Sequence, residues 1–305
     1  MAIRIGIVGV GKIAQDQHIP VLNASPDFDL VTAASRHGRI EGGVTHPTIG
    51  EMLDAEQIDA VSLCQPPQVR FDAARMAIAA GKHVFLEKPP GATLSEITIL
   101  RDMAREKGVT LFASWHSRYA AGVDAARTWL ADKVLHSVLI EWKEDVRHWH
   151  PGQTWIWEAG GMGVFDPGIN ALSIATAILP PFFLTEGTLE IPSNCASPIA
   201  ADLTFTDAAG TPIKAEFDFR QTGPQTWDIR IETDGGTLVL SKGGSELSID
   251  GVAQSLPPEA EYRGLYDRFA ALIAAGESDV DVSPLRHVAD AYLRAERREV
   301  EAFHD

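Results

Sequence analysis

The chain has 305 residues, and its 26 Lys and Arg against 42 Asp and Glu give a formal net charge of −16 with His neutral. This charge disfavours DNA, RNA and anionic membranes as partners, because phosphate-bearing surfaces are bound by neutralising them with basic side chains. Hydrophobic residues make up 45% of the chain and charged residues 22%, which is typical of a globular protein. The length favours two domains, and Cys64 and Cys195 lack the spacings of zinc sites and disulfide frameworks. No apolar run reaches the ~20 residues of a membrane span, so we expect a two-domain protein of the reducing cytoplasm.

The first 120 residues alternate short β-branched runs with helical patterns. We predict buried strands at residues 3–8, 30–34, 60–64, 83–86 and 109–113. Between them, two predicted helices, 70–80 and 94–107, are each followed by a glycine, as is usual at helix C-termini. Strands that alternate with helices form a parallel sheet, because parallel strands require crossover connections. We therefore predict an α/β, doubly wound domain over residues 1–120, an architecture typical of nucleotide binding.

Beyond residue 120 the predicted strands become longer and alternate polar with apolar residues. A helix at 121–131 precedes strands at 137–146, 200–206, 213–220, 226–233 and 237–241, several of them joined by hairpin signals. Further helices are expected at 170–179, 262–275 and 283–302. This pattern predicts an α+β domain over residues 121–305 with an open, mostly antiparallel sheet. From this architecture we expect one face of the sheet to serve in homodimerisation. Its C-terminal helix is free to pack back on the first domain.

A glycine turn follows the first predicted strand. Residues 9–14 read Gly-Val-Gly-Lys-Ile-Ala, the pattern G-x-G-x-x-A. In such a turn the first glycine makes the tight bend, the second lets the backbone approach a pyrophosphate, and the following helix directs N–H groups at it. Glycines also occur in ordinary turns, but here strand, turn and helix stand in the required order. We predict a dinucleotide site that uses Gly9, Gly11, Lys12 and Ile13.

The second predicted strand indicates which dinucleotide is bound. An NAD site commonly has an acidic residue about 20 positions after the glycine turn, bonded to the ribose 2′-OH. Asp27 and Asp29 have that spacing, but they precede the strand at 30–34 and so lie at its wrong end. The other end carries Ser35 and Arg36, and an arginine there suits a 2′-phosphate. The alternative is a solvated arginine; we predict NADP, with NAD tolerated.

Three further motifs occur in a characteristic order. Gln65-Pro66-Pro67 follows the third strand, Glu87-Lys88-Pro89 follows the fourth, and residues 160–170 read Gly-Gly-Met-Gly-Val-Phe-Asp-Pro-Gly-Ile-Asn. Together with the glycine turn, they resemble the glucose-fructose oxidoreductase, inositol dehydrogenase and rhizopine catabolism family over essentially the whole chain. Within this family the chain is most similar to the sugar 1-dehydrogenases that oxidise D-galactose or L-arabinose.

The resemblance implies a Rossmann domain, an open-sheet second domain and hydride transfer between a pyranose carbon and the nicotinamide. It also implies that Gln65, Pro66, Glu87 and Lys88 contact the cofactor, and that Lys88 reaches the reacting hydroxyl or the nicotinamide ribose. Lys88 follows a parallel strand at its carboxyl end, where ligands bind in doubly wound sheets. The alternative is an exposed lysine at the end of a strand.

The second-domain motif departs from the commoner family pattern. Many members have histidine four residues after the aspartate, whereas this chain has Asp166 and Asn170. The i, i+4 spacing puts both on one helix face, so both can touch one ligand. Because asparagine takes no proton at physiological pH, the base is Asp166, Lys88 with a depressed pKa, or a relay between them. The alternative for Asp166 is a helix cap followed by Pro167 at the first helical position.

Two other polar residues are candidate sugar ligands. His116 follows the fifth predicted strand, where it could bond a sugar hydroxyl or orient the base, although a lone histidine is more often structural. Glu144 shares a strand face with Val138, Ile140 and Trp142, the face expected to be buried, and a buried carboxylate needs a partner. Sugar hydroxyls would suit it. The alternative is a surface glutamate.

Aromatic residues are dense around residues 148–157. Sugars stack their C–H faces on aromatic rings, so Trp149, His150 and, from a later strand, Trp227 are candidate substrate contacts, with core packing as the alternative for each tryptophan. The His148-Trp149-His150 sequence could also bind a metal, but no third ligand is evident and hydride transfer needs none. We therefore predict no metal.

These observations predict an NAD(P)-dependent oxidation of an aldopyranose at C1 to the lactone. The preferred substrate is D-galactose, with L-arabinose or D-fucose also accepted, and Lys88, Asp166 and Asn170 form the catalytic group. One alternative is oxidation at another ring carbon of a sugar or inositol. A second is a non-catalytic sensor that binds NADP.

Overall fold

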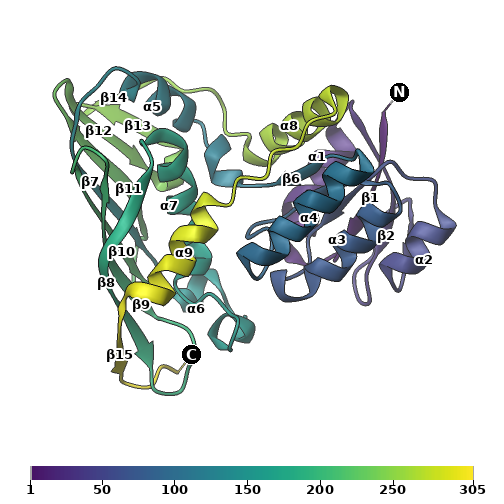
Figure 1. Ribbon diagram of the computed structural model, residues 1–305, viewed down its shortest axis with the longest axis horizontal. Coiled ribbons are helices and arrows are strands. Elements are labelled where there is room, and N and C mark those ends of the chain that lie inside the picture. The colour runs from purple at the N-terminus through teal and green to yellow at the C-terminus, as the bar shows by residue number, and fades with distance from the viewer. Residues whose placement is uncertain (1, 305) are drawn as a thin grey trace. The chain divides into compact units, whose positions relative to one another are not determined.

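The computed structural model describes residues 2–304. It consists of two compact units (Figure 1). The first unit contains the chain up to His116 together with Glu261–Val282. The second contains Ser117–Ala260 together with the chain from Ser283 onwards. The first unit therefore takes a helical segment from the later part of the sequence.

The first unit is built on a six-stranded, all-parallel sheet with the order β3-β2-β1-β4-β5-β6. Its strands are β1 (Ile3–Val8), β2 (Phe28–Ala34), β3 (Val44–His46), β4 (Ala60–Leu63), β5 (His83–Leu86) and β6 (Leu111–Ala113). This is the doubly wound sheet that the sequence predicts, with the short edge strand β3 added. The carboxyl ends of β1, β4 and β5 lie side by side, because β1 pairs with β4 and β4 with β5.

Helices flank this sheet. They are α1 (Ile19–Ala24), α2 (Ile49–Ala55), α3 (Arg70–Ala79), α4 (Leu94–Lys107) and α8 (Glu261–Ala275), with the short turns η1 (Ala14–His18) and η2 (Pro67–Val69). Helix α4 is capped at both ends. At its N-cap the Thr93 hydroxyl accepts from the Glu96 amide, and its C-cap is Gly108 in the left-handed region. Helix α8 packs through aromatic rings, with Tyr266 stacked on Phe85 at 4.9 Å between ring centroids. The predicted helix at 262–275 is thus confirmed and belongs to the first unit.

The second unit contains a nine-stranded mixed sheet with the order β14-β13-β12-β11-β7-β10-β9-β8-β15. Its strands are β7 (Leu135–Lys143), β8 (Phe182–Pro192), β9 (Ala200–Asp207), β10 (Pro212–Asp218), β11 (Thr226–Thr233), β12 (Gly236–Ser241), β13 (Glu246–Ile249), β14 (Val252–Ala253) and β15 (Glu296–Val300). Most neighbours are antiparallel, whereas β10 with β7 and β15 with β8 are parallel. The predicted open, mostly antiparallel sheet is confirmed.

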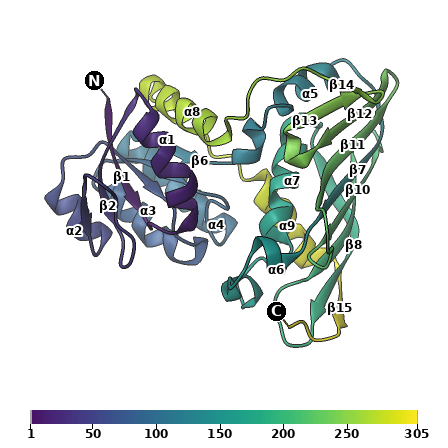
Figure 2. The same cartoon turned by 180° about the vertical axis from the view of Figure 1, so that it is seen from behind.

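Helices α5 (Val123–Leu130), α7 (Phe165–Ile178) and α9 (Ser283–Arg294) lie on one side of this sheet (Figures 1 and 2). The other helical segments are α6 (Val146–Trp149), η4 (Thr154–Trp157), η5 (Lys242–Gly244) and η3 (His116–Tyr119), the last at the junction of the two units. The opposite face of the sheet carries charged side chains. Lys143, for example, forms ion pairs with Glu141 on its own strand and with Glu216 on β10.

Three predicted elements differ from the structure. The helix predicted at 283–302 ends at Arg294, because residues 296–300 form β15 beside β8, a strand that the sequence analysis omits. The charged side chains of β15 are as typical of an exposed helix surface as of an edge strand. The strand predicted at 137–146 ends at Lys143, since Asp145 caps α6. Helix α7 begins at Phe165 instead of 170 because proline is tolerated in a first helical turn.

Candidate functional site

The glycine turn has the geometry that a pyrophosphate requires. Gly9 has φ +88°, and a Cβ there would lie 2.9 Å from the Gln65 amide nitrogen, so only glycine fits. At Gly11 a Cβ would meet nothing within 4 Å, and the residue is exposed, as are Lys12 and Ile13. Ala14 is wholly buried. A backbone that is open at the second glycine and packed at the small sixth residue fits a dinucleotide phosphate.

The residues expected at the ribose lie beside this turn. Ser35 and Arg36 follow β2, and the Ser35 hydroxyl accepts from the Gly38 amide at 3.2 Å. A Cβ on Gly38 would lie 2.2 Å from the Val10 carbonyl oxygen, so the 35–38 loop packs directly on the glycine turn. Arg36 is exposed. The structure therefore brings the loop that carries Arg36 next to the glycine turn.

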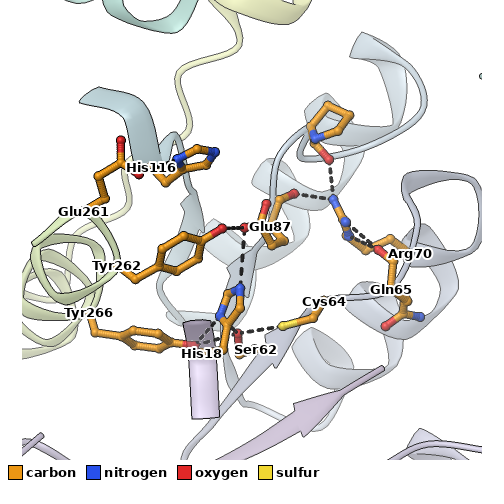
Figure 3. A network of polar contacts seen from close by, with 11 residues as sticks. His18, Ser62, Cys64, Gln65, Arg70, Glu87, His116, Glu261, Tyr262 and Tyr266 are labelled. Atoms are coloured by element: carbon orange, nitrogen blue, oxygen red, sulfur yellow. Dashed lines mark hydrogen bonds and ion pairs between the residues drawn. The ribbon is translucent and has the colours of Figure 1, made fainter. Parts of the chain in front are cut away.

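Arg70 connects the loops after β4 and β5, a role that the sequence analysis missed. It is buried, and its guanidinium donates to the backbone carbonyls of Gln65, Glu87 and Pro89 (Figure 3). Burial lowers the pKa of Arg70 to about 10, although the nearby Glu87 carboxylate acts in the opposite direction. Nothing in the sequence distinguishes this arginine from an exposed one at the start of a helix.

Glu87, at the end of β5, is a buried carboxylate. The Tyr262 hydroxyl donates to its Oε1 at 2.8 Å, and His18 Nε2 lies 3.4 Å from the same oxygen (Figure 3). Burial would raise the pKa of Glu87, but the hydrogen bond to His18 and the charges of His18, His116 and Lys88 lower it to about 2. Lys88 follows it, half-buried, and a cis peptide bond joins Lys88 to Pro89. The exposed alternative for Lys88 is therefore not what the structure shows.

His116 is fixed within the first unit by two residues at the start of α8. Its Nδ1 lies 2.9 Å from Glu261 Oε2, and its ring stacks on Tyr262 at 5.4 Å between centroids. Glu261 and Tyr262 therefore fix the orientation of the His116 ring.

The second unit holds a chain of three polar residues. His150 Nε2 lies 2.8 Å from Glu144 Oε1, and His150 Nδ1 lies 3.7 Å from Asp166 Oδ2. Trp227 Nε1 donates to the other Glu144 oxygen at 2.8 Å. Glu144 is 1% exposed, so the surface alternative for it is wrong, and its burial is stabilised by these two donors. All four residues, Trp227 included, are predicted site residues, but their positions in the sequence do not show that they contact one another.

Asp166 and Asn170 lie one turn apart in α7. The N-cap of this helix is Val164, with no side-chain cap, so Asp166 is the second helical residue and the cap alternative is wrong. Asp166 is buried and Asn170 is half-buried. Position 170 carries an amide where many family members have an imidazole. An imidazole nevertheless lies next to Asp166, because His150 directly follows α6 and its Nδ1 is 3.7 Å from the Asp166 carboxylate.

Three tryptophan rings lie beside the polar residues Glu144, His150 and Asp166. The rings of Trp142 and Trp227 stack at 5.9 Å, and those of Trp227 and Trp149 lie 4.8 Å apart. Trp142 is buried and Trp227 half-buried, whereas Trp149 is 40% exposed. Trp149 is therefore not a core residue, and its ring is open to a ligand.

No group of three or more His, Cys, Asp or Glu side chains within residues 2–304 is placed to hold a metal ion. None of the helices in this range is both long enough and apolar enough to cross a bilayer.

Comparison with known proteins adds independent information. Residues 3–114 match the family described as "Oxidoreductase family, NAD-binding Rossmann fold" (GFO_IDH_MocA). The chain is 49% identical over 307 aligned positions to a galactose 1-dehydrogenase of Pseudomonas fluorescens, covering 99% of both chains. It is 61% identical to the crystal structure of a D-galactose-1-dehydrogenase from Rhizobium etli, with TM-score 0.97 over 99% of this chain and 98% of that one. KijD10, a 3-ketoreductase from Actinomadura kijaniata solved with NADP, shares the fold at 18% identity, with TM-score 0.84 over 98% of this chain and 100% of that one.

Proposed function

Because the chain belongs to the GFO_IDH_MocA oxidoreductase family, whose Rossmann fold binds NAD, we propose that it is a sugar dehydrogenase acting at C1. The reaction converts an aldopyranose into its lactone and reduces NAD(P)⁺. The observation that carries this proposal is the 49% identity to a galactose 1-dehydrogenase along nearly the whole of both chains. In this proposal residues 1–120 bind the cofactor, and residues 121–305 bind the sugar with one further contact from His116.

The first unit would hold the dinucleotide. The backbone of Gly9 and Gly11, with Lys12 and Ile13 at the helix start, receives the pyrophosphate. Arg36 and Ser35 receive the ribose 2′-phosphate, which makes NADP the preferred form with NAD tolerated. The contacts at the nicotinamide end come from strand-end residues, namely Gln65, Pro66, Glu87 and Lys88. When bound, the nicotinamide supplies the acceptor for the hydride at its C4.

The acid–base chemistry falls to Lys88 and Asp166, which together accept the proton of the anomeric hydroxyl. A hemiacetal C–H is already activated by the ring oxygen, so one base suffices. His150 lies against Asp166 and is itself oriented by the buried Glu144, the arrangement by which a carboxylate fixes an imidazole. Asn170, one turn along α7, bonds the same sugar region as Asp166.

The sugar contacts that we propose are His116, Glu144, Trp149, His150 and Trp227. The exposed ring of Trp149 offers a face for the sugar C–H groups. Glu144 already accepts one hydrogen bond on each oxygen, and each oxygen retains a second lone pair for a sugar hydroxyl. A neutral sugar needs no electrostatic steering, so the net charge of −16 is compatible with this substrate.

A panel of aldoses with NADP or NAD, followed by the absorbance of the reduced cofactor, tests the proposal. We expect the fastest turnover with D-galactose and slower turnover with L-arabinose and D-fucose. An apolar pocket distinguishes the C5 substituents of these sugars by only ~1–3 kcal/mol. Methyl β-D-galactoside separates the alternatives, since its anomeric oxygen is blocked. Turnover of this glycoside would show oxidation at another ring carbon, and NADP binding without turnover of any sugar would show a sensor.

Two further parts of the proposal concern the assembly and its compartment. We expect a homodimer through the face of the nine-stranded sheet opposite α5, α7 and α9. Neither Cys64 nor Cys195 is in a disulfide among the described residues, which suits a reducing cytoplasm. Sedimentation of the purified protein tests the first part.

A further inference from the structure

A buried histidine in the first unit has no role in the function proposed above. His18 is the last residue of η1, the π-helical turn that directly follows the glycine turn, and its side chain is wholly buried. Its ring meets Phe85 of β5, at 5.7 Å between centroids, and the rings of Tyr262 and Tyr266 of α8, at 4.9 and 5.8 Å. Three segments of the first unit that are distant in sequence therefore meet at this imidazole (Figure 3).

The hydrogen bonds around His18 fix where its protons are. The Tyr266 hydroxyl donates to Ser62 Oγ at 2.9 Å, so it accepts from His18 Nδ1, which lies 2.8 Å away. A neutral ring with its proton on Nδ1 would present the lone pair of Nε2 to Glu87 Oε1 at 3.4 Å. Two lone pairs facing each other in a buried site repel, so this geometry favours a proton on Nε2 as well as on Nδ1. His18 and Glu87 therefore form a buried ion pair.

The groups facing the ring support this protonation. Burial would lower the pKa of His18, but the Cys64 sulfur, the Tyr266 hydroxyl and the Glu87 carboxylate raise it well above its usual 6.5. Cys64 comes from the end of β4, Tyr266 from α8 and Glu87 from the end of β5. These three residues, with Ser62 and Tyr262, are the titratable or polar groups packed around the imidazole.

Glu87 is held on one oxygen only. Its Oε1 receives both His18 and Tyr262, whereas its buried Oε2 has no hydrogen-bond partner within residues 2–304. A buried carboxylate oxygen without a partner is costly, which suits an atom kept for an incoming donor. Lys88 is the next residue in the sequence, so contacts that fix the Glu87 side chain also restrict the position of the Lys88 backbone.

We infer that His18 is a positioning residue, which fixes the Glu87 carboxylate next to Lys88 and so connects the glycine turn with the reacting end of β5. This inference rests on the role of Lys88 in the proposed function. His18 itself touches neither sugar nor cofactor in this scheme. It acts through Glu87, with Tyr262 as the second support of the same oxygen.

Loss of the His18 charge has a predictable consequence for the pH profile. If Glu87 stays ionised without its cation, the site beside Lys88 carries one more uncompensated negative charge, which favours the protonated form of the site up to a higher pH. If Glu87 instead takes up a proton, its Oε2 can accept a donor only after the pH is raised. Both routes move the acid limb of kcat/KM in the same direction, to higher pH.

The test compares His18→Gln with His46→Gln. His46 also pairs with a carboxylate in the first unit, with Nε2 3.1 Å from Glu56 Oε1. It lies on the edge strand β3, however, which is not a neighbour of β5 in the sheet. We expect His18→Gln to lower kcat by ~10–100-fold, on the scale of a misplaced acid–base group. We also expect it to move the acid limb up by about one pH unit or more, with the sugar KM nearly unchanged. His46→Gln should keep the wild-type kcat and profile.

Two further variants distinguish the possible failures. Tyr262→Phe removes one hydrogen bond from Glu87 Oε1 and keeps the ring, so it should shift the acid limb in the same direction by less; it decides the question if His18→Gln does not fold. An unmoved acid limb in the folded variants, with Lys88→Ala inactive, overturns the positioning role alone. Near-normal turnover of Lys88→Ala overturns the proposed role of Lys88 and the positioning role with it.

Discussion

His150 Nδ1 lies 3.7 Å from the Asp166 carboxylate, while its other ring nitrogen is bound by the buried Glu144. An imidazole held between two carboxylates has a fixed orientation. It places an imidazole next to Asp166, one helical turn from the amide of Asn170.

Replacing this imidazole tests whether the chain of three residues acts as a unit. We expect His150→Asn to lower kcat by ~100-fold, the scale of a lost acid–base partner, with NADP affinity unchanged because the first unit is untouched. The control is His148→Asn, two residues earlier in the sequence. The His148 ring is exposed and its one described ring contact is with Trp149, so turnover should persist in this variant. Equal turnover of the two variants would exclude His150 from the chemistry.

The two proposed base residues make a second prediction. Lys88→Ala and Asp166→Asn should each bind NADP normally and lose turnover by at least ~100-fold. Lys107→Ala, at the exposed end of α4, is the matched control for Lys88. Stopped-flow measurement of cofactor reduction separates loss of chemistry from slow product release. A variant that keeps normal single-turnover rates removes its residue from the base.

The cofactor preference depends on Arg36. We expect Arg36→Ala to weaken NADP binding by ~10–100-fold, since charge-assisted hydrogen bonds to a phosphate contribute ~1.5–3 kcal/mol. The affinity for NAD, which has no 2′-phosphate, should hardly change. Arg39 in the same loop bonds the backbone carbonyls of Ser35 and Gly38, so Arg39→Ala is a control that keeps the preference. Parallel losses for both cofactors in Arg36→Ala would contradict the assignment.

The glycine turn makes a prediction that separates folding from binding. An alanine at Gly11 would have open space around its Cβ, so we expect an unchanged melting temperature and an NADP affinity at least ~10-fold weaker, because the methyl group stands where the pyrophosphate approaches. An alanine at Gly9 would meet the Gln65 backbone at 2.9 Å with φ +88°, so it should also lower the melting temperature. Unchanged NADP affinity in Gly11→Ala would place the phosphate elsewhere.

The His18–Glu87 pair predicts how stability depends on pH. The folded pKa of Glu87 is lowered from 4.5 to about 2, so its contribution is present above pH 4.5 and is lost as the pH falls towards 2. The folded pKa of His18 is raised, so its contribution is complete below pH 6.5 and is lost as the pH rises through the raised value. The pair therefore stabilises the fold most between pH 4.5 and 6.5. Melting curves should show a steeper acid loss for the wild type than for Glu87→Gln; identical slopes would contradict this.

The sequence by itself determined the features that local chemistry encodes. The glycine turn, the alternation of strands and helices and the capped helix α4 follow from residues close together in the chain, because backbone geometry and hydrophobic periodicity act over a few residues. The burial of Glu144 was predicted from the alternation of the preceding residues, and it holds although the strand itself ends one residue earlier, at Lys143. Local patterns failed where they are ambiguous, as at β15, whose charged residues suit a helix surface and an edge strand equally well.

Only the tertiary structure decided which polar groups meet. His18 bonds Tyr266 across 248 positions of sequence, and Tyr262 bonds Glu87 across 175. The contact of His150 with Asp166 joins two different helices. No periodic pattern records such partners, because each side chain is brought to its neighbour by the packing of whole elements. The candidate site residues can therefore be identified from the sequence, whereas the contacts among them, and the protonation that those contacts favour, are determined by the fold.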